Sequence, residues 1–157
     1  MTLLPDRVDQ LLAVADEEVA AGRLPACQLA LALGGEVVVR HTVGAPPDST
    51  FTTFSVTKAV TAAVAWMHLA AETKVVELVP EFTGGGKEHV TVEHLLTHTA
   101  GFPRAPMPTE QGADPRARRQ RFATWRLDWQ PGTQLEYHAT SAHWVVATMV
   151  ELSLIHI

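Results

Sequence analysis

The stretch FSVTKAV, residues 54–60, places Ser55 and Lys58 three positions apart at the start of an otherwise apolar run. Residues spaced i and i+3 share one face of a helix, so the two side chains are expected to meet. From Ser55 to Ala71 the pattern predicts a helix that is apolar nearly all round, which is typical of a buried central helix. A buried lysine is costly unless it is paired or has lost its charge. Lys58 therefore calls for a partner.

Ser55 and Lys58 have the chemistry of an activated nucleophile. A serine in the first turn of a helix lies at free backbone N–H groups and at the positive end of the helix dipole. A neighbouring amine can withdraw the serine proton, and the serine N–H can help to hold an oxyanion. The spacing alone is weak, since 4 serines and 3 lysines in 157 residues give about 0.08 such pairs by chance. Spacing therefore leaves open that Ser55 only caps the helix and that Lys58 extends into solvent.

Composition limits the class of protein. The 157 residues are 46% hydrophobic and 18% charged, which predicts one globular domain without low-complexity segments. The net charge of −5 gives the protein as a whole no attraction to nucleic acid or an anionic membrane. Cys27 is the single cysteine, so neither a disulfide framework nor a Cys-x-x-Cys metal clip is expected. No secretory signal pattern opens the chain and no apolar run is long enough to span a bilayer, so we expect a cytoplasmic protein.

The remaining periodicities predict α+β architecture. A helix is expected over residues 6–21, then a β-hairpin around Gly34-Gly35, then the helix that carries Ser55, and after it mostly helices. GGGKEH, residues 84–89, is a turn and lacks the spacing of a phosphate loop. Thr91 is expected to cap a short helix, and the second half of LEYHATSAHWVVATMVEL, residues 135–152, is expected to be helical.

Four longer stretches give a resemblance to a known family. They are TTFSVTKAVTAAVAWMHLAA (52–71), VPEF (79–82), VTVEHLLTHTAGFP (90–103) and PGTQLEYHATSAHWVVATMVE (131–151). Together they resemble the serine β-lactamase-like hydrolases, which include class C β-lactamases, D-Ala-D-Ala peptidases related to penicillin-binding proteins, and family VIII carboxylesterases. The most specific piece is LLTHTAGFP, residues 95–103. The resemblance implies the fold of β-lactamases and penicillin-binding-protein transpeptidases, truncated after its helical region, with the later strands of the sheet absent.

The resemblance implies three catalytic residues. Ser55 matches the acylated nucleophile, Lys58 its partner in the first motif, and Tyr137 the tyrosine of a Tyr-x-Asn motif. A tyrosine has an unperturbed pKa near 10, and an adjacent lysine cation would favour the phenolate, which could then take the Ser55 proton. From the residues alone, Tyr137 could equally be a half-buried aromatic. No metal or organic cofactor is implied.

The chain departs from the family pattern in three places, one of which is a shortened stretch at AAETKVVELVPEF, residues 70–82. Ala139 stands where the family usually has Asn or Ser, so a side-chain hydrogen bond near the nucleophile is missing, which favours an esterase over a β-lactamase. The last family motif, a Lys- or His-x-Gly, would lie beyond residue 157. LSLIHI, residues 152–157, resembles the translated end of a transposase-type sequencing adapter. We therefore expect a partial domain over residues 1–151, a non-native tail over 152–157, and little or no activity in the fragment itself.

Other interpretations remain open. His94 and His98 have a spacing that can hold a metal, although no third ligand follows in a matching pattern. Five arginines between residues 116 and 126 predict a solvated helix face or, less in keeping with the acidic chain, a nucleic-acid site. His138 adjoins Tyr137, and its side chain is expected to point away from it.

The function predicted from the sequence is hydrolysis through an acyl-enzyme on Ser55, with a small carboxylic ester as substrate. A β-lactam or a D-amino-acid peptide is the second choice of substrate. A non-catalytic binding module is the alternative of another class. Neither nucleic acid nor membrane is expected as a partner.

Overall fold

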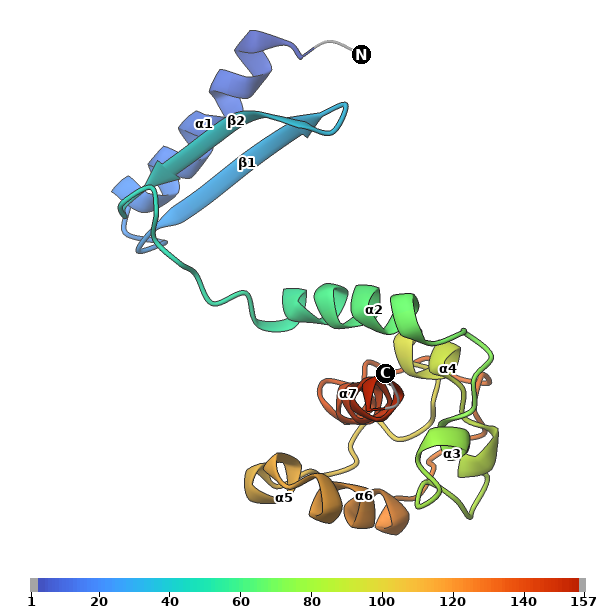
Figure 1. The fold of residues 1–157 in the computed structure, drawn as a ribbon. Coiled ribbons are helices and arrows are strands. Elements are labelled where there is room, and N and C mark those ends of the chain that lie inside the picture. The colour runs from blue at the N-terminus through green and yellow to red at the C-terminus, as the bar shows by residue number, and fades with distance from the viewer. Residues whose placement is uncertain (1–2, 156–157) are drawn as a thin grey trace. The chain divides into compact units, whose positions relative to one another are not determined.

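A computed structural model describes residues 3–155 of the chain. It divides into two compact units, Met1–Thr52 and Thr53–Ile157, and each unit is described by itself (Figure 1). The domain expected over residues 1–151 spans both units.

The first unit contains one helix and one hairpin. Helix α1, Pro5–Ala20, begins with a proline, whose missing N–H costs nothing in the first turn, and it ends just before Gly22, which has a φ of 69°. The helix packs against strand β2, Glu36–Val43. His41 on this strand lies 2.6 Å from Asp16 of the helix, from Nε2 to Oδ1. The helix predicted over residues 6–21 is therefore confirmed within one residue at each end.

The hairpin follows from its two glycines. Strand β1, Cys27–Leu33, pairs antiparallel with β2, and Leu33 stands opposite Glu36. Gly34 and Gly35 between them have φ angles of 60° and 88°, values that residues with a side chain rarely adopt and that a two-residue hairpin turn requires. A register irregularity lies between Leu31 and Ala32. The predicted hairpin is confirmed.

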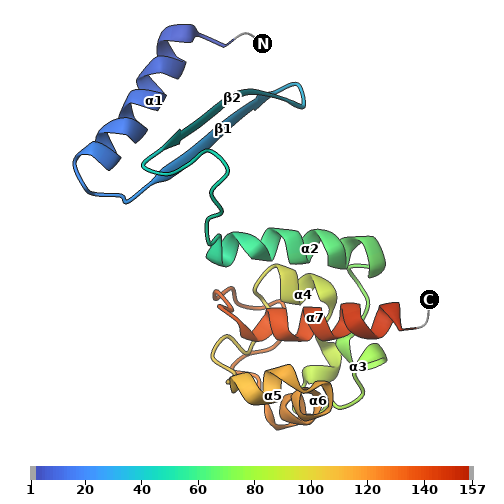
Figure 2. The ribbon, with the colours of Figure 1, turned by 60° about the vertical axis from the view of Figure 1, so that its left-hand side comes forward.

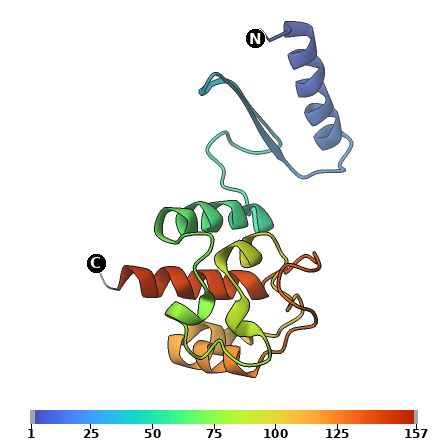
Figure 3. The same ribbon diagram turned by 90° about the vertical axis from the view of Figure 1, so that its right-hand side faces the viewer.

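The second unit is helical, and α7, Ser141–Leu154, lies at its centre. This helix packs against α2, α3 and α4, and it lies between α2 and the α5–α6 pair (Figure 2, Figure 3). Its buried side chains include Val145, Val146 and Met149. The other elements are the 3-10 turn η1, Phe54–Val56; α2, Thr57–His68; α3, Val75–Leu78; the 3-10 turn η2, Lys87–His89; α4, Val92–Leu96; α5, Thr109–Ala113; and α6, Pro115–Thr124.

Helix α2 is where it was predicted, but the prediction that it is buried and central is wrong. Ala65 is its one buried residue within the described chain, and Val60, Trp66 and Met67 are 65%, 78% and 78% exposed. The helix contacts α7 through one stripe, so the apolar residues on its other sides remain uncovered within this unit. The central place belongs to α7 instead, because several elements pack around that helix.

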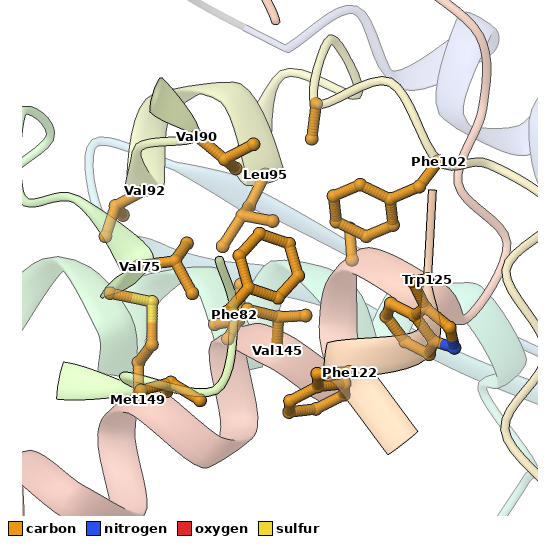
Figure 4. Packing of buried hydrophobic residues seen from close by; sticks show 14 of the residues in the cluster. Val75, Phe82, Val90, Val92, Leu95, Phe102, Phe122, Trp125, Val145 and Met149 are labelled. Carbon is orange, nitrogen blue, oxygen red and sulfur yellow. The ribbon is translucent and has the colours of Figure 1, made fainter. Parts of the chain in front are cut away.

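The core of the second unit is built from aromatic and branched side chains (Figure 4). Phe82 meets Phe102 edge to face with ring centroids 5.5 Å apart, and Phe122 meets Trp125 in the same manner at 4.9 Å. Such pairs stabilise by about 0.5–1.5 kcal/mol beyond the area they bury. Val145 from α7 and Leu95 from α4 complete this layer and are fully buried. The core therefore fixes α4 and α7, the two helices that flank the candidate site.

Lys87 is a buried cation with a structural task. Its Nζ donates to the carbonyl oxygens of Phe122 and Ala123, at 2.9 and 3.0 Å, in the last turn of α6. A cation at the C-terminal end of a helix satisfies free carbonyls and opposes the negative end of the dipole. Lys87 follows Gly84–Gly86, which all have positive φ, as expected for the predicted turn. The side chain therefore joins this turn to α6.

The arginine-rich segment forms α6, as predicted, but it is not a uniformly solvated face. Arg118 is buried, donates to the carbonyl oxygen of Gly112 at 2.9 Å, and pairs with Glu151 of α7. Arg121 donates to the carbonyl oxygen of Pro106 at 3.2 Å. These arginines join α6 to neighbouring segments, because their positions on the helix face other elements of the unit rather than solvent.

The end of the chain was expected to be a non-native tail. Residues 152–154 continue α7, and residues 156 and 157 lie outside the described residues.

None of the helices in the described part of the chain is both long and apolar enough to cross a membrane.

Candidate active site

Ser55 lies in a short 3-10 turn directly before α2. Phe54, which precedes it, has a φ of 45°, and its side chain is 81% exposed. A left-handed conformation is uncommon for a bulky residue and is typical of functional sites. The N-cap of α2 is Val56, and no side chain caps that end of the helix. The interpretation of Ser55 as a helix cap is therefore wrong, and its hydroxyl is available for other partners.

Lys58 and Tyr137 both converge on the Ser55 hydroxyl. Lys58 Nζ lies 3.1 Å from Ser55 Oγ, and the Tyr137 hydroxyl lies 2.9 Å from the same atom. Lys58 Nζ is also 5.1 Å from the centre of the Tyr137 ring, within the range of a cation–π contact. The partner of Lys58 is thus Ser55, and the three residues that the resemblance singled out lie together.

Tyr137 is held in place by its neighbours along an extended segment. His138 is fully buried, and its Nε2 accepts a hydrogen bond from the Phe102 N–H at 3.1 Å. The His138 N–H in turn donates to Nδ1 of His98 at 3.2 Å. His138 is buried whereas Tyr137 is half-exposed, so the two neighbouring side chains point to different sides and the Tyr137 hydroxyl reaches Ser55. His138 points away from the tyrosine hydroxyl, as predicted.

The charge of Lys58 acts on the groups around it. The Lys58 ammonium, then the Ser55 hydroxyl, lower the pKa of Tyr137 below its ordinary value. Burial, then His138 and Lys58, lower the pKa of His98. Burial, then Lys58 and His98, lower the pKa of His143 to about 4. The neutral form of both imidazoles is therefore favoured, and the Tyr137 hydroxyl is more acidic than that of an ordinary tyrosine.

A small hollow opens beside the nucleophile. Its volume is about 270 Å³, and it is lined by Phe54, Ser55, Thr57, Lys58, Thr61 and His143. A larger hollow of about 630 Å³ lies elsewhere in the unit, between the Gly84–Gly85 turn and the segment after α6. The larger volume contains none of the three converging residues, so chemistry rather than size identifies the candidate site.

The possible metal pair has another role. His94 belongs to the capping box of α4: Thr91 Oγ1 accepts from the His94 N–H, and His94 Nδ1 accepts from the Thr91 N–H at 3.1 Å. The predicted cap at Thr91 is thereby confirmed. His98 lies beyond the end of α4, with a φ of 61°, so the two rings do not share a helix face. Within residues 3–155 no group of three or more His, Cys, Asp or Glu side chains is placed to hold a metal ion.

His143 also lines the hollow, although the sequence did not single it out. This residue is in the first turn of α7, six positions after Tyr137, and no motif marks it. The one hint in the sequence is that His143 is a polar residue at the start of the apolar helix that follows Tyr137. Ala139 is exposed and brings no polar side chain to the site.

The chain is similar to several known proteins. The family model described as Beta-lactamase matches residues 9–153. No curated protein gives a match. Among solved structures, a penicillin-binding protein homologue from Caulobacter crescentus is 27% identical with a TM-score of 0.75, and the match covers 97% of this chain and 45% of that one.

Two further solved structures are similar as well. A family VIII carboxylesterase is 25% identical with a TM-score of 0.77, covering 92% of this chain and 44% of that one. EstA from Arthrobacter nitroguajacolicus Rue61a is 27% identical with a TM-score of 0.73, covering 90% and 41%. The chain thus spans less than half the length of the solved structures that it matches.

Proposed function

Because the chain belongs to the beta-lactamase family, as its motifs predicted, we propose that it is a serine hydrolase that forms an acyl-enzyme on Ser55. The observation that carries the proposal is the convergence of Lys58 Nζ and the Tyr137 hydroxyl on Ser55 Oγ, at 3.1 and 2.9 Å. A serine within hydrogen-bond reach of a base, itself oriented by a third group, is the arrangement of an activated nucleophile.

The lowered pKa of Tyr137 suggests the path of the proton. Tyr137, as the phenolate favoured by Lys58, takes the proton of Ser55 as Ser55 Oγ bonds to the carbonyl carbon of the substrate. The leaving group then departs with that proton, and an ester on Ser55 remains. A water molecule, giving its proton to Tyr137, hydrolyses this ester and returns the free serine. The Ser55 N–H contributes one donor to the oxyanion.

We propose small carboxylic esters as the substrates. The hollow beside Ser55 is about 270 Å³, below the usual range for drug-sized ligands, and Ala139 leaves out the amide or hydroxyl that would help to hold a peptide-like group. One of the similar structures is named a family VIII carboxylesterase, and another is named EstA. The small hollow favours an acyl group of few atoms, and the other two points favour an ester over an amide.

β-Lactams or D-amino-acid peptides are the second candidate substrates. The specific observation in their favour is the 27% identity to a penicillin-binding protein homologue over 97% of this chain. A non-catalytic binding module, in which Ser55 is never acylated, is the alternative of another class.

A serine-directed probe separates these proposals. The full-length protein is incubated with a fluorophosphonate and its intact mass is measured, and one adduct is expected, whereas the 157-residue chain alone is expected to label little or not at all. The adduct should be lost in Ser55→Ala and kept in Ser49→Ala, a control in the other unit. A folded chain without an adduct would favour the binding module. Turnover of p-nitrophenyl acetate or butyrate, without acylation by a fluorescent penicillin, supports the ester; the reverse result supports the β-lactam.

A further inference from the structure

Three arginines line one small hollow of the second unit, which we call the arginine hollow. Its volume is about 250 Å³, and it is bounded by Arg104, Arg121 and Arg126 together with the aromatic residues Phe102 and Trp125. None of the three converging residues of the candidate active site lines it. The chain has a net charge of −5, so a group of cations would be expected to have acidic partners close by.

Only one of the three arginines has such partners. Arg104 forms ion pairs with Asp128, at 3.1 Å, and with Glu136. Arg121 and Arg126 form no ion pair with a carboxylate in the part of the chain that the structure describes. Asp128 lines the hollow as well, but Arg104 already engages it. The arginine hollow therefore keeps an excess of positive charge.

The fold itself makes little use of this charge. A cation at the end of α6 could oppose the helix dipole, but Lys87 already donates to two carbonyl oxygens in the last turn of that helix. Arg121 donates through Nε to the carbonyl oxygen of Pro106 at 3.2 Å, which leaves its terminal nitrogens without a partner among residues 3–155. The side chain of Arg126 makes no hydrogen bond within the same residues. Both guanidinium groups can therefore donate to a ligand.

Hydrogen bonds and packing hold the walls of the arginine hollow in place. The Pro106 carbonyl oxygen accepts a second hydrogen bond, from Trp125 Nε1 at 3.1 Å, so it fixes Arg121 and the indole together. The rings of Trp125 and Phe102 lie 5.5 Å apart, and only 5% and 1% of these residues are exposed. Walls that are already ordered reduce the entropy lost on binding.

The chemistry of these walls indicates the class of ligand. A guanidinium presents a planar pair of donors that matches the two oxygens of a carboxylate. Apolar residues complete the hollow, namely Phe102, Ala105, Pro106 and Trp125. They suit the hydrocarbon part of an organic acid, whereas inorganic phosphate presents oxygen atoms on all sides. A volume of about 250 Å³ is below the usual range for drug-sized ligands, so the acid is small.

We propose that the arginine hollow binds a small organic carboxylate. Arg121 and Arg126 donate to its oxygens, and its apolar part lies against Trp125. The inference goes beyond the proposed hydrolase function and does not depend on it, because none of the residues that hold the carboxylate belongs to the candidate active site.

Titration of the folded protein with sodium benzoate, at constant ionic strength, tests the site. The chain has 4 tryptophans, so nitrogen–proton NMR gives few indole N–H resonances, and Trp125→Phe identifies that of Trp125. We expect this resonance to shift saturably, with a Kd on the order of 1 mM. Benzamide, which has a similar shape without the charge, should leave the resonance in place. Sodium phosphate should bind more weakly than benzoate.

Matched variants locate the binding. Arg126→Gln should weaken benzoate binding about tenfold, because a charge-assisted hydrogen bond is lost. Arg116→Gln removes the same charge from an exposed position of α6 that does not line the hollow, so it should bind as the wild type does.

A third variant separates two neighbouring hollows. Arg126 and Trp125 also border the larger hollow of about 630 Å³, whereas Ala105 does not. Ala105→Leu narrows the arginine hollow without changing its charge, and it should weaken benzoate binding as well. Circular dichroism shows whether each variant is folded.

Four results would overturn the inference. They are a Trp125 resonance that benzoate does not shift, equal affinity in the wild type and Arg126→Gln, full affinity in Ala105→Leu, and phosphate binding as tight as that of benzoate. Lys58→Met should keep benzoate binding; loss in this variant would place the ligand at the nucleophile instead and would also refute the proposal. Labelling of Ser55 by a fluorophosphonate enters none of these measurements, so failure here is distinct from failure of the proposed function.

Discussion

The depressed pKa of His143 makes the stability of the chain depend on pH, with a defined sign. The pKa is about 4 in the folded chain and about 6.5 in the unfolded one, where the ring is solvated. Between these values the unfolded chain binds more protons than the folded chain. The free energy of unfolding therefore falls as the pH is lowered through this window, and it levels off below pH 4.

The magnitude follows from the same two values. A difference of about 2.5 in pKa, at about 1.4 kcal/mol for each pH unit, corresponds to about 3 kcal/mol once the pH is below both values. At pH 5 the folded ring is still mostly neutral, and the penalty relative to pH 7 is about 2 kcal/mol. Burial also lowers the pKa values of His98 and His138, which adds to the slope in the wild type.

Urea titrations at pH 7 and pH 5 isolate the contribution of His143. In His143→Asn the loss of unfolding free energy between the two pH values should be smaller than in the wild type by about 2 kcal/mol, since His98 and His138 act in both proteins. His89→Asn, which changes an exposed histidine, should retain the full loss. Equal losses of unfolding free energy in the wild type and His143→Asn would show that the ring is neither buried nor close to the Lys58 ammonium. The site described above would then be wrong.

Three further predictions concern other parts of the second unit. Lys87→Met should lower the free energy of unfolding by about 2 kcal/mol in urea titrations, because two hydrogen bonds from a charged donor are lost while the cost of burying the ammonium is recovered. The control Lys74→Met, at an exposed position, should change it by less than about 0.5 kcal/mol, and a Lys87→Met variant as stable as the wild type would contradict the prediction. Tyr137 is the single tyrosine, so its phenolate absorbance is unambiguous: it should titrate below the ordinary pKa of 10 in the wild type and at higher pH in Lys58→Met, and identical curves would refute the influence of Lys58. Gly101→Ala should cost more than about 3 kcal/mol in the same titrations, because its φ is 93° and a Cβ would lie 2.5 Å from the Trp129 carbonyl oxygen, whereas Gly85→Ala, with positive φ but open space, should cost about 1 kcal/mol; similar losses would speak against the close approach.

Features set by neighbouring residues could be predicted from the sequence. The Gly34-Gly35 turn, the cap at Thr91 and the meeting of Ser55 with Lys58 each depend on a few positions along the chain. Local steric and hydrogen-bonding preferences decide such features, so the pattern of residues is sufficient. The position of Tyr137 needed the resemblance as well, since no local pattern relates it to Ser55.

Features set by packing could not be predicted. Helices α2 and α7 are both apolar, and periodicity does not tell which of them other elements will surround. Lys87 and Arg118 read as polar positions of a turn and a helix, although each side chain is buried against carbonyl oxygens. His143 was missed for the same reason: its role depends on which way the ring points from α7.

The Tyr137–Ser55 hydrogen bond joins residues 82 positions apart, and this separation bears on when the nucleophile becomes reactive during synthesis. Ser55 and Lys58 leave the ribosome first, and at about 5–20 residues per second roughly 4–16 s pass before Tyr137 follows. Through that interval the nascent chain carries an ordinary serine, because the phenolate that would take its proton has not yet been made. If Ser55 is acylated as proposed, its activation waits for the synthesis of Tyr137, and the order of synthesis protects the nascent chain from premature acylation.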